Sequence, residues 1–415
     1  MNDLAAIRET VGRLMPETER FLADLIRLPS MPGREEEVMN FLADAFGKIE
    51  AGVEKVPLSN TLRNDPDYSD PIPDLMYDGR FNLRMVKPGA GRGRRVLLNT
   101  HVDVVPPSEE MVEPWTPTVR EGALWGRGAC DAKGQVATIY LVFYAMEALG
   151  WRPGGDVIAH LVVEEENGGN GTLAMVRRGE QADVCIVLEP SDNVVFTSIR
   201  GAVWFRLTLK GKAGHSGQAG QTRSALLMAR DAMAVLERYH AELLAASRGL
   251  PLFDAHPNPM PLTFGRLQSG NWPASAPSQA VLEGVLGFLP NRTHEQVAHG
   301  MAQALKTCGN GLLADHADLT FMYRHDSSVL NPNHDLPQGL LRAAQICGRS
   351  LTVGAMTASC DAWFYNNQLG IPTVVYGPGT LKVAHSKDEH IGLHAIAEAA
   401  EHLLVFLQTR NGANP

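Results

Sequence analysis

The sequence lacks a long hydrophobic run, a hydrophobic leader and a basic stripe. No apolar stretch approaches the ~20 residues of a membrane helix, so we expect no membrane span. The first residues, MNDLAAIRETVGRLMPETERF, do not join a basic start to an apolar stretch, so we expect no signal peptide. The net charge is −9, with acidic and basic residues intermixed. This balance argues against nucleic acid and anionic membranes as partners.

Cysteine is also scarce. The five cysteines are scattered, odd in number and form no CxxC pair, which predicts reduced thiols in a cytoplasmic protein. The sequence has no internal repeat and no low-complexity tract. It also has no GxSxG motif, so a serine nucleophile on a strand-to-helix elbow is excluded.

The 415 residues, 44% of them hydrophobic, suffice for two or three domains with a large core. Short apolar runs alternate with helical patterns, which predicts an α/β fold with a mostly parallel sheet between helices. The expected strands are 94–100, 156–163, 182–188, 351–355 and 372–377. The expected helices are 3–28, 35–49, 133–149, 171–179, 335–347 and 391–409.

Between about 197 and 325 the pattern changes. Long alternating strands in VVFTSIRGAVWFRLTLKGK precede a helix at 222–245, strands near 261–267 and 279–289, a helix at 291–308 and a strand at 317–324. This βαββαβ order predicts a small α+β, ferredoxin-like domain. We expect residues 198–325 to be inserted into a catalytic domain made of residues 1–197 and 326–415.

Residues 57–80 are rich in Pro, Asp and Asn and contain no periodic pattern. They predict a long irregular segment, either a disordered loop, which the composition favours, or a loop that faces the substrate.

Histidines and carboxylates occur where strands are expected to end. In parallel sheets such ends gather at one edge, so these residues can meet in space. Three carboxylates carry −3, and two divalent cations and a hydroxide would bring the site to zero. Mixed nitrogen and oxygen ligands favour zinc, with manganese or cobalt as alternatives. The expected metal ligands are His101 (NTHVDVVP), Asp131 (GRGACDAKG), Glu166 (EEENGG), Glu189 (LEPSD) and His385 (VAHSKDE).

Three further residues have candidate catalytic roles. Asp103 could hold the second ring nitrogen of His101, although a His-x-Asp pair also occurs by chance at strand ends. Glu165, next to Glu166, could take a proton from water and pass it to a leaving amine. His215, in KGKAGHSGQAG, is either an oxyanion donor or an ordinary surface histidine.

These motifs together resemble the M20 metallopeptidase family of acetylornithine deacetylases, succinyl-diaminopimelate desuccinylases, aminoacylases and carboxypeptidase G2. The resemblance runs from LPSMPG to the end of the chain, with the motifs in the family's order. It implies that His101, Asp131 and Glu189 hold one metal ion, and that Asp131, Glu166 and His385 hold the other. Glu165 would be the general acid/base. The small domain would be a lid through which a homodimer forms, so that His215 reaches the partner's site.

The sequence departs from the family at substrate positions. Ala274 stands where many members have Asn, with Asn271 nearby, and Val285 stands where many have a carboxylate-binding Arg. Trp363 follows the Cys360-Asp361-Ala362 turn in place of a basic residue. A less polar or aromatic substrate is therefore expected. Arg200 or Arg292 could replace the missing Arg, and Asn271, Gly377 and Gly379 are candidate substrate contacts.

The expected reaction is hydrolysis of an amide, in which a hydroxide between the metal ions deacylates an N-acyl amino acid or similar small molecule. A dipeptidase or carboxypeptidase, or a hydrolase of another C–N bond such as that of an aromatic amine, remains an alternative. A binding protein that lost catalysis is disfavoured, because Glu165 and all five ligands are present.

Overall fold

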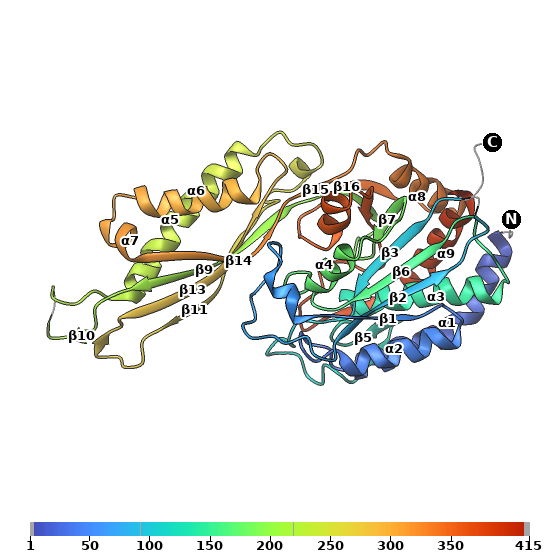
Figure 1. The fold of residues 1–415 in the computed structure, drawn as a ribbon, viewed down its shortest axis with the longest axis horizontal. Helices are drawn as coiled ribbons and strands as arrows, with labels where there is room; N and C mark the ends of the chain where they lie inside the picture. Colours follow the sequence, from blue (N-terminus) through green and yellow to red (C-terminus); the bar gives the residue numbers. More distant parts are fainter. Residues whose placement is uncertain (1–3, 92, 219, 411–415) are drawn as a thin grey trace.

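The computed structural model describes residues 4–91, 93–218 and 220–410 and shows two bodies placed end to end (Figure 1). The termini of the predicted catalytic domain, residues 1–3 and 411–415, lie outside the described residues, as does the first residue of the helix expected at 3–28. Within the described ranges, no helix is long and apolar enough to cross a bilayer.

The larger body is built on a mixed sheet with nine strands in the described part of the chain. These are β1 (Glu54–Pro57), β2 (Phe81–Lys87), β3 (Val96–His101), β6 (Val157–Val162), β7 (Val184–Val187), β8 (Val194–Ile199), β15 (Ser328–Val329), β16 (Thr352–Met356) and β17 (Thr373–Val375). The order is β1-β2-β6-β3-β7-β17-β8-β15, and β16 also pairs with β8. The central strands β6, β3, β7 and β17 are parallel, while β1, β2, β8 and β15 pair antiparallel with their neighbours in this order and β16 pairs parallel with β8. The predicted α/β class with a mostly parallel central sheet is confirmed.

Helices cover both faces of this sheet (Figure 1). Side chains alternate along each strand, so Leu98 and Ala159 join one hydrophobic cluster while Leu97 and Ile158 join another on the opposite face. The first cluster includes residues of α1, α2, α3, α8 and α9, and the second includes residues of α4 and η4. The helices are α1 (Leu4–Arg27), α2 (Glu36–Lys48), α3 (Gly134–Ala148), α4 (Asn170–Arg177), α8 (Asp335–Ile346) and α9 (Leu393–Arg410), and η4 is a short turn (Phe364–Gln368).

Sequence patterns did not predict β2, because its polar residues are buried against specific partners. The Asn82 amide donates to the carbonyl of Gly171 and accepts from the N–H of Val163. Arg84, which is partly buried, forms an ion pair with Glu180. Such partners come from distant segments, so the strand lacks the apolar run by which the other central strands were recognised.

Short elements complete the larger body. A small sheet contains β4 (Thr118–Arg120), β5 (Ala123–Trp125) and β18 (His390–Gly392). The remaining turns are η1 (Asn60–Asn64) and η2 (Ala129–Lys133). The segment 57–80 is ordered, which corrects the favoured expectation of disorder: Tyr77 is fully buried, and the N–H of Asp70 donates to the carbonyl of Met322 at 2.8 Å.

The smaller body has an antiparallel sheet in the order β11-β13-β9-β14. On β9, Val203, Phe205 and Leu207 are buried in the core of this body, while Trp204 and Arg206 alternate onto the other face. The elements follow the expected βαββαβ order: β9 (Gly201–Lys210), α5 (Ala225–Ala246), β11 (Leu262–Ser269), β13 (Gln279–Phe288), α6 (His294–Thr307) and β14 (Ala317–His325). Additional short elements are β10 (Gly214–His215), η3 (Phe253–Ala255), β12 (Ser275–Ala276) and α7 (Gly311–His316).

A ladder of aromatic rings joins the two bodies. Trp204 of β9 stacks on Tyr323 of β14 with ring centres 5.5 Å apart, and Tyr323 lies 4.0 Å from His325. His325 stacks in turn on Trp363, just before η4 of the larger body, at 4.4 Å. We call these four residues the aromatic ladder. It fixes the smaller sheet against the segment that follows β16.

His325 should make stability depend on pH. Its side chain is buried, and in the described part of the chain neither ring nitrogen has a hydrogen-bond partner. Burial, aided by the charges of His294 and Arg324, lowers the pKa of His325 to about 3. The folded state therefore favours the neutral ring. The stability that the neutral ring contributes to the folded state is fully present above the ordinary pKa of about 6.5. It is lost as the pH falls from there towards 3.

We expect His325→Phe to reduce the acid sensitivity of the unfolding free energy by up to about 1.4 kcal/mol per pH unit between pH 6 and 4. Urea unfolding at several pH values would measure the slope, with His299→Gln, at an exposed histidine of α6, as the control. Parallel curves for His325→Phe and the wild type would contradict this assignment.

Candidate metal centre

The predicted ligands converge at one edge of the larger sheet. β3 ends at His101, and Glu166 and Glu189 follow β6 and β7. Because these three strands are parallel neighbours, their carboxyl ends lie together. Asp131 comes from η2, and His385 from the loop between β17 and β18.

Asp131 stands at the centre of this group. Its Oδ1 atom lies 3.1 Å from Nε2 of His101, and its Oδ2 atom lies 3.2 Å from Nε2 of His385. Nε2 of His385 is 3.1 Å from Oε1 of Glu166, and Nε2 of His101 is 3.8 Å from Oε1 of Glu189. One donor atom from each of His101, Asp131 and Glu166 fits within 4.8 Å of the others. The two oxygens of Asp131 thus face two different histidines, as a bridging carboxylate requires.

Asp103 holds both His101 and the chain that follows β6. Nδ1 of His101 lies 2.9 Å from the backbone carbonyl oxygen of Asp103 and 3.5 Å from its Oδ1 atom. We assign a proton to Nδ1, which leaves Nε2 facing Asp131. The carboxylate of Asp103 accepts hydrogen bonds from the N–H groups of Glu165 and Glu166 at 3.1 and 3.0 Å. Asp103 therefore positions one histidine and two glutamates at once.

The three adjacent glutamates have different environments. Glu164 has a left-handed backbone with φ of 65°, and its carboxylate is buried away from the ligands. There it pairs with Arg80 and accepts hydrogen bonds from Tyr77 and Asn170. The sequence assigned roles to Glu165 and Glu166 and none to Glu164, and the contacts of Glu164 with Arg80, Tyr77 and Asn170 lie apart from the predicted ligands.

Burial raises the pKa of Glu165 and of Glu189 well above the ordinary value, although the charge of His101 opposes this shift in both. Burial by itself would lower the pKa values of the two histidines. The surrounding carboxylates have the larger effect, so the pKa of His101 is raised well above its usual range and that of His385 to about 11. Protonated histidines thus balance the crowded carboxylates, and bound cations would take over that role.

The donor set fits divalent cations. Three carboxylates and two imidazoles lie in a largely buried group, and Asp131 presents one oxygen to each side of it. This mixture of nitrogen and oxygen donors suits zinc, manganese or cobalt. Magnesium instead prefers sites whose ligands are all oxygen atoms.

Glu389 is a site residue that the sequence did not reveal. Its Oε1 atom accepts hydrogen bonds from the N–H groups of Cys130 and Asp131, both at 3.1 Å. Its Oε2 atom pairs with Arg127 at 2.5 Å, and both side chains are 1% exposed or less. Glu389 thus fixes the turn that presents Asp131. The run SKDEH offered a signal, but spacing could not tell which of its acids turns inward.

Asp361 is also buried beside the ligands. Its Oδ2 atom accepts a hydrogen bond from Thr172 at 2.6 Å, and burial raises its pKa to about 7. A Cβ atom on Gly169 would lie 2.7 Å from its Oδ1 atom, so glycine is required there. Asp361 therefore packs against the loop that leads from Glu166 to α4.

The other predicted residues fall into two groups. Gly377 and Gly379 flank the ligands. A Cβ atom on Gly377 would lie 2.8 Å from the carbonyl oxygen of Glu189, and one on Gly379 would lie 2.7 Å from Sγ of Cys130. His215 and Asn271 are exposed in the smaller body, at or near the β10–β12 pair, which lies at the end remote from the larger sheet (Figure 1). The structure does not bring them to the ligands of the same chain.

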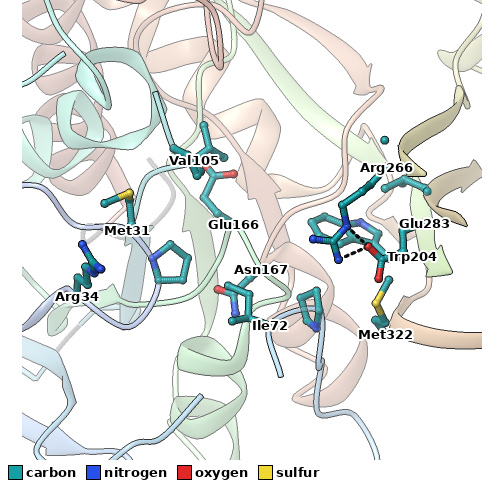
Figure 2. A pocket seen from close by; sticks show the side chains of 16 residues that line it. Met31, Arg34, Ile72, Val105, Glu166, Asn167, Trp204, Arg266, Glu283 and Met322 are labelled. Carbon is teal, nitrogen blue, oxygen red and sulfur yellow. Dashed lines mark hydrogen bonds and ion pairs between the residues drawn. The ribbon is translucent and has the colours of Figure 1, made fainter. Parts of the chain in front are cut away.

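A cleft of about 710 Å³ opens beside Glu166, between the larger body and the outer face of the smaller sheet (Figure 2). Arg200 and Arg292, suggested as replacements for the missing Arg, do not line it. Arg200 is buried, and its guanidinium donates to the carbonyls of Thr357 and Gly201. The cleft is lined by Met31, Pro32, Arg34, Pro71, Ile72, Val105, Pro106, Glu166, Asn167, Trp204, Gly265, Arg266, Glu283, Gly284, Val285 and Met322.

Parallel strand ends that gather carboxylates, histidines and an adjacent glutamate define a metal-dependent hydrolase. The sequence matches the model of peptidase family M20/M25/M40 over residues 97–409. The chain belongs to this family and is a hydrolase of amide bonds.

Known proteins agree with this assignment. The N-formyl-4-amino-5-aminomethyl-2-methylpyrimidine deformylase of Bacillus subtilis (strain 168) is 25% identical over 347 residues, which cover 75% of this chain and 78% of the relative. The di-peptidase Dug1p of Saccharomyces cerevisiae has the same fold, with a TM-score of 0.80 at 14% identity over 100% of this chain and 99% of that one. A dinuclear metal-binding M20 peptidase of Bacillus subtilis gives a TM-score of 0.64 at 14% identity, covering 96% of this chain and 98% of that one.

Removal of Glu389 should weaken metal binding. We expect Glu389→Ala to lower metal affinity about 10–100-fold, because the turn that presents Asp131 loses its anchor. The variant should also lose about 3–5 kcal/mol of stability, since the charge of Arg127 stays buried without its partner. Competition with a chromogenic chelator and thermal unfolding would measure both effects. Glu110→Gln, at an exposed ion pair with Lys387, is the control. Unchanged metal affinity in Glu389→Ala would refute the anchoring role.

Proposed function

We propose that this protein deacylates a small N-acyl compound, such as an N-acyl amino acid, with Glu165 as general acid/base. The proposal rests chiefly on one observation: two histidines and two glutamates gather around Asp131 with donor atoms suited to a metal, and Glu165 adjoins one of the glutamates in the chain. The cleft beside Glu166 is large enough for a small molecule, since ligand pockets typically measure about 300–1,000 Å³.

His101, Asp131 and Glu189 would hold one cation, and Asp131, Glu166 and His385 the other. Zinc is the favoured metal, with manganese and cobalt as alternatives. When bound, such ions polarise the amide carbonyl and increase the acidity of water.

The protein's own groups would handle the protons. Glu165 would accept a proton from the attacking water and deliver it to the leaving amine. Asp103 would act as a positioning residue, since its carboxylate holds the N–H groups of both Glu165 and Glu166.

Deacylation is favoured over peptide hydrolysis by the wall of the cleft. Val285, an apolar side chain, lines the cleft at the position where a carboxylate-binding Arg was expected. A dipeptide carries two charged ends, whereas an N-acyl amino acid carries one, so an apolar wall favours the substrate with fewer charges, and dipeptidase or carboxypeptidase activity stands as the second candidate. Hydrolysis of an aromatic amine is a further variant, supported by the same apolar wall.

We further propose that residues 198–325 form a lid and dimerisation domain inserted between residues 1–197 and 326–415. The exposed Leu226 and Leu227 on α5 and Leu267 on the edge strand β11 support an interface there. In such a homodimer, His215 would serve the partner's site as an oxyanion donor, which agrees with its distance from the ligands of its own chain. The scattered free thiols support a cytoplasmic location.

Glu165→Gln should lower kcat about 10²–10⁴-fold while leaving the bound metal nearly unchanged, because the side chain moves protons but holds no cation. Asp131→Ala should lose both metal and activity. Steady-state kinetics with N-acyl amino acids and elemental analysis of each purified variant would measure this.

Loss of metal in Glu165→Gln would instead make Glu165 a ligand. The proposal as a whole fails if the wild-type enzyme contains no stoichiometric transition metal and its activity is indifferent to chelators. Dipeptides and aromatic amines tested beside the N-acyl amino acids would separate the alternative activities.

Complementation tests whether His215 acts across subunits. We expect His215→Ala alone to lower kcat about 10²–10³-fold. Co-expression with Glu165→Gln should restore about a quarter of wild-type activity, since half of the dimers are mixed and each mixed dimer has one intact site. Assays of the co-expressed and separate chains would measure this. Absence of restoration would place His215 in its own subunit's function, and an unaffected His215→Ala would make it a surface histidine.

A further inference from the structure

The cleft has an aromatic wall that the catalytic groups do not use. Trp204 belongs to β9, and its register partner on β13 is Val285. Both side chains line the cleft, together with Met322 of β14 and Ile72 of the 57–80 segment. Figure 2 shows Trp204 and Met322 on the side contributed by the smaller sheet, and Glu166 and Asn167 on the other. The wall therefore faces Glu166, one of the predicted ligands, across one shared space.

The indole of Trp204 is held rigidly. One side stacks on Tyr323 with an interplanar angle of 27°, and Tyr323 is itself 5% exposed. Tyr323 also lies against the catalytic loop, because a Cβ atom added to Gly168 would come 3.1 Å from its ring. The ring that supports Trp204 thus contacts the loop that follows Glu165 and Glu166. A fixed aromatic surface next to the catalytic loop is suited to binding a second flat ring.

Charges on this wall are only partly paired. Glu283 is bound by Arg206 at 2.6 Å and by Arg266, so one carboxylate neutralises part of two guanidinium charges. The side chain of Arg206 is 32% exposed and that of Arg266 is 58% exposed. Both guanidinium groups contact Glu283, which leaves one net positive charge in this group, and Trp204 lies beside it (Figure 2).

We propose that the substrate carries an aromatic ring, remote from the scissile amide, which packs on Trp204 between Ile72 and Met322. This inference rests on the proposed amide hydrolysis and adds the class of substrate. The cleft selects its substrate by stacking and apolar contact at the point where Val285 offers no charge to a carboxylate.

Matched substrates test the role of Trp204. N-(4-phenylbutanoyl)alanine and N-acetylphenylalanine carry a ring that saturated carbons separate from the scissile amide, whereas N-acetylalanine carries no ring. We expect Trp204→Ala to raise KM for the ring-bearing substrates about 10–100-fold with kcat nearly unchanged, and to alter N-acetylalanine less than about threefold. Trp204→Phe should restore most of the difference. Leu312→Ala, at an exposed leucine of α7 outside the cleft, is the control and should behave as wild type.

Equal losses for all three substrates in Trp204→Ala would reduce Trp204 to a structural residue, and no change would exclude it from the cleft's selectivity. Calorimetric binding of the same compounds to Glu165→Gln, with and without Trp204→Ala, gives a readout independent of turnover. If the wild type hydrolyses none of these amides but the ring-bearing ones bind in a Trp204-dependent manner, the proposed function fails and the aromatic subsite stands. If binding shows no preference for the ring, the subsite fails whatever the activity.

Discussion

The structure depends on the concentration of negative charge at one edge of a sheet. Asp131, Glu166 and Glu189 would repel one another if only water and apolar side chains surrounded them. His101 and His385 stand against these carboxylates, and their pKa values rise in response. Any cation that displaces those protons gains a site whose ligands are already oriented. The folding of the sheet edge and the affinity for metal are therefore two consequences of one electrostatic arrangement.

Neighbouring acids that are not ligands are satisfied separately. Glu164 pairs with Arg80, and Glu389 pairs with Arg127, so these two buried carboxylates outside the donor group each contact a guanidinium. Asp103 is satisfied by backbone N–H groups instead. This separation keeps the donor group electrostatically distinct. These ion pairs also join the sheet edge to more distant segments, since Arg80 also pairs with Glu35, the residue before α2.

The sequence predicted what depends on strand order and little of what depends on side-chain direction. Parallel strands gather their ends, so the meeting of His101 with Glu189 followed from two apolar runs and their polar ends. The opposite directions of Glu164 and Glu165 come from one left-handed residue, which no spacing reveals. Glu389 acts through a turn that lies 258 residues away in the chain. The order in segment 57–80 comes from contacts such as Asp70 with Met322, between parts of the chain that the sequence cannot place together.

The aromatic ladder connects substrate recognition to the arrangement of the two bodies. Trp204 faces the cleft, while Trp363 at the other end of the ladder belongs to the larger body. Stacked rings resist sliding less than ion pairs resist separation, but they exclude water and keep their spacing. A ring bound on Trp204 would extend the same stack by one member. Binding of an aromatic substrate would then favour the relative position of the two bodies seen here, because it adds contacts that exist in this arrangement alone.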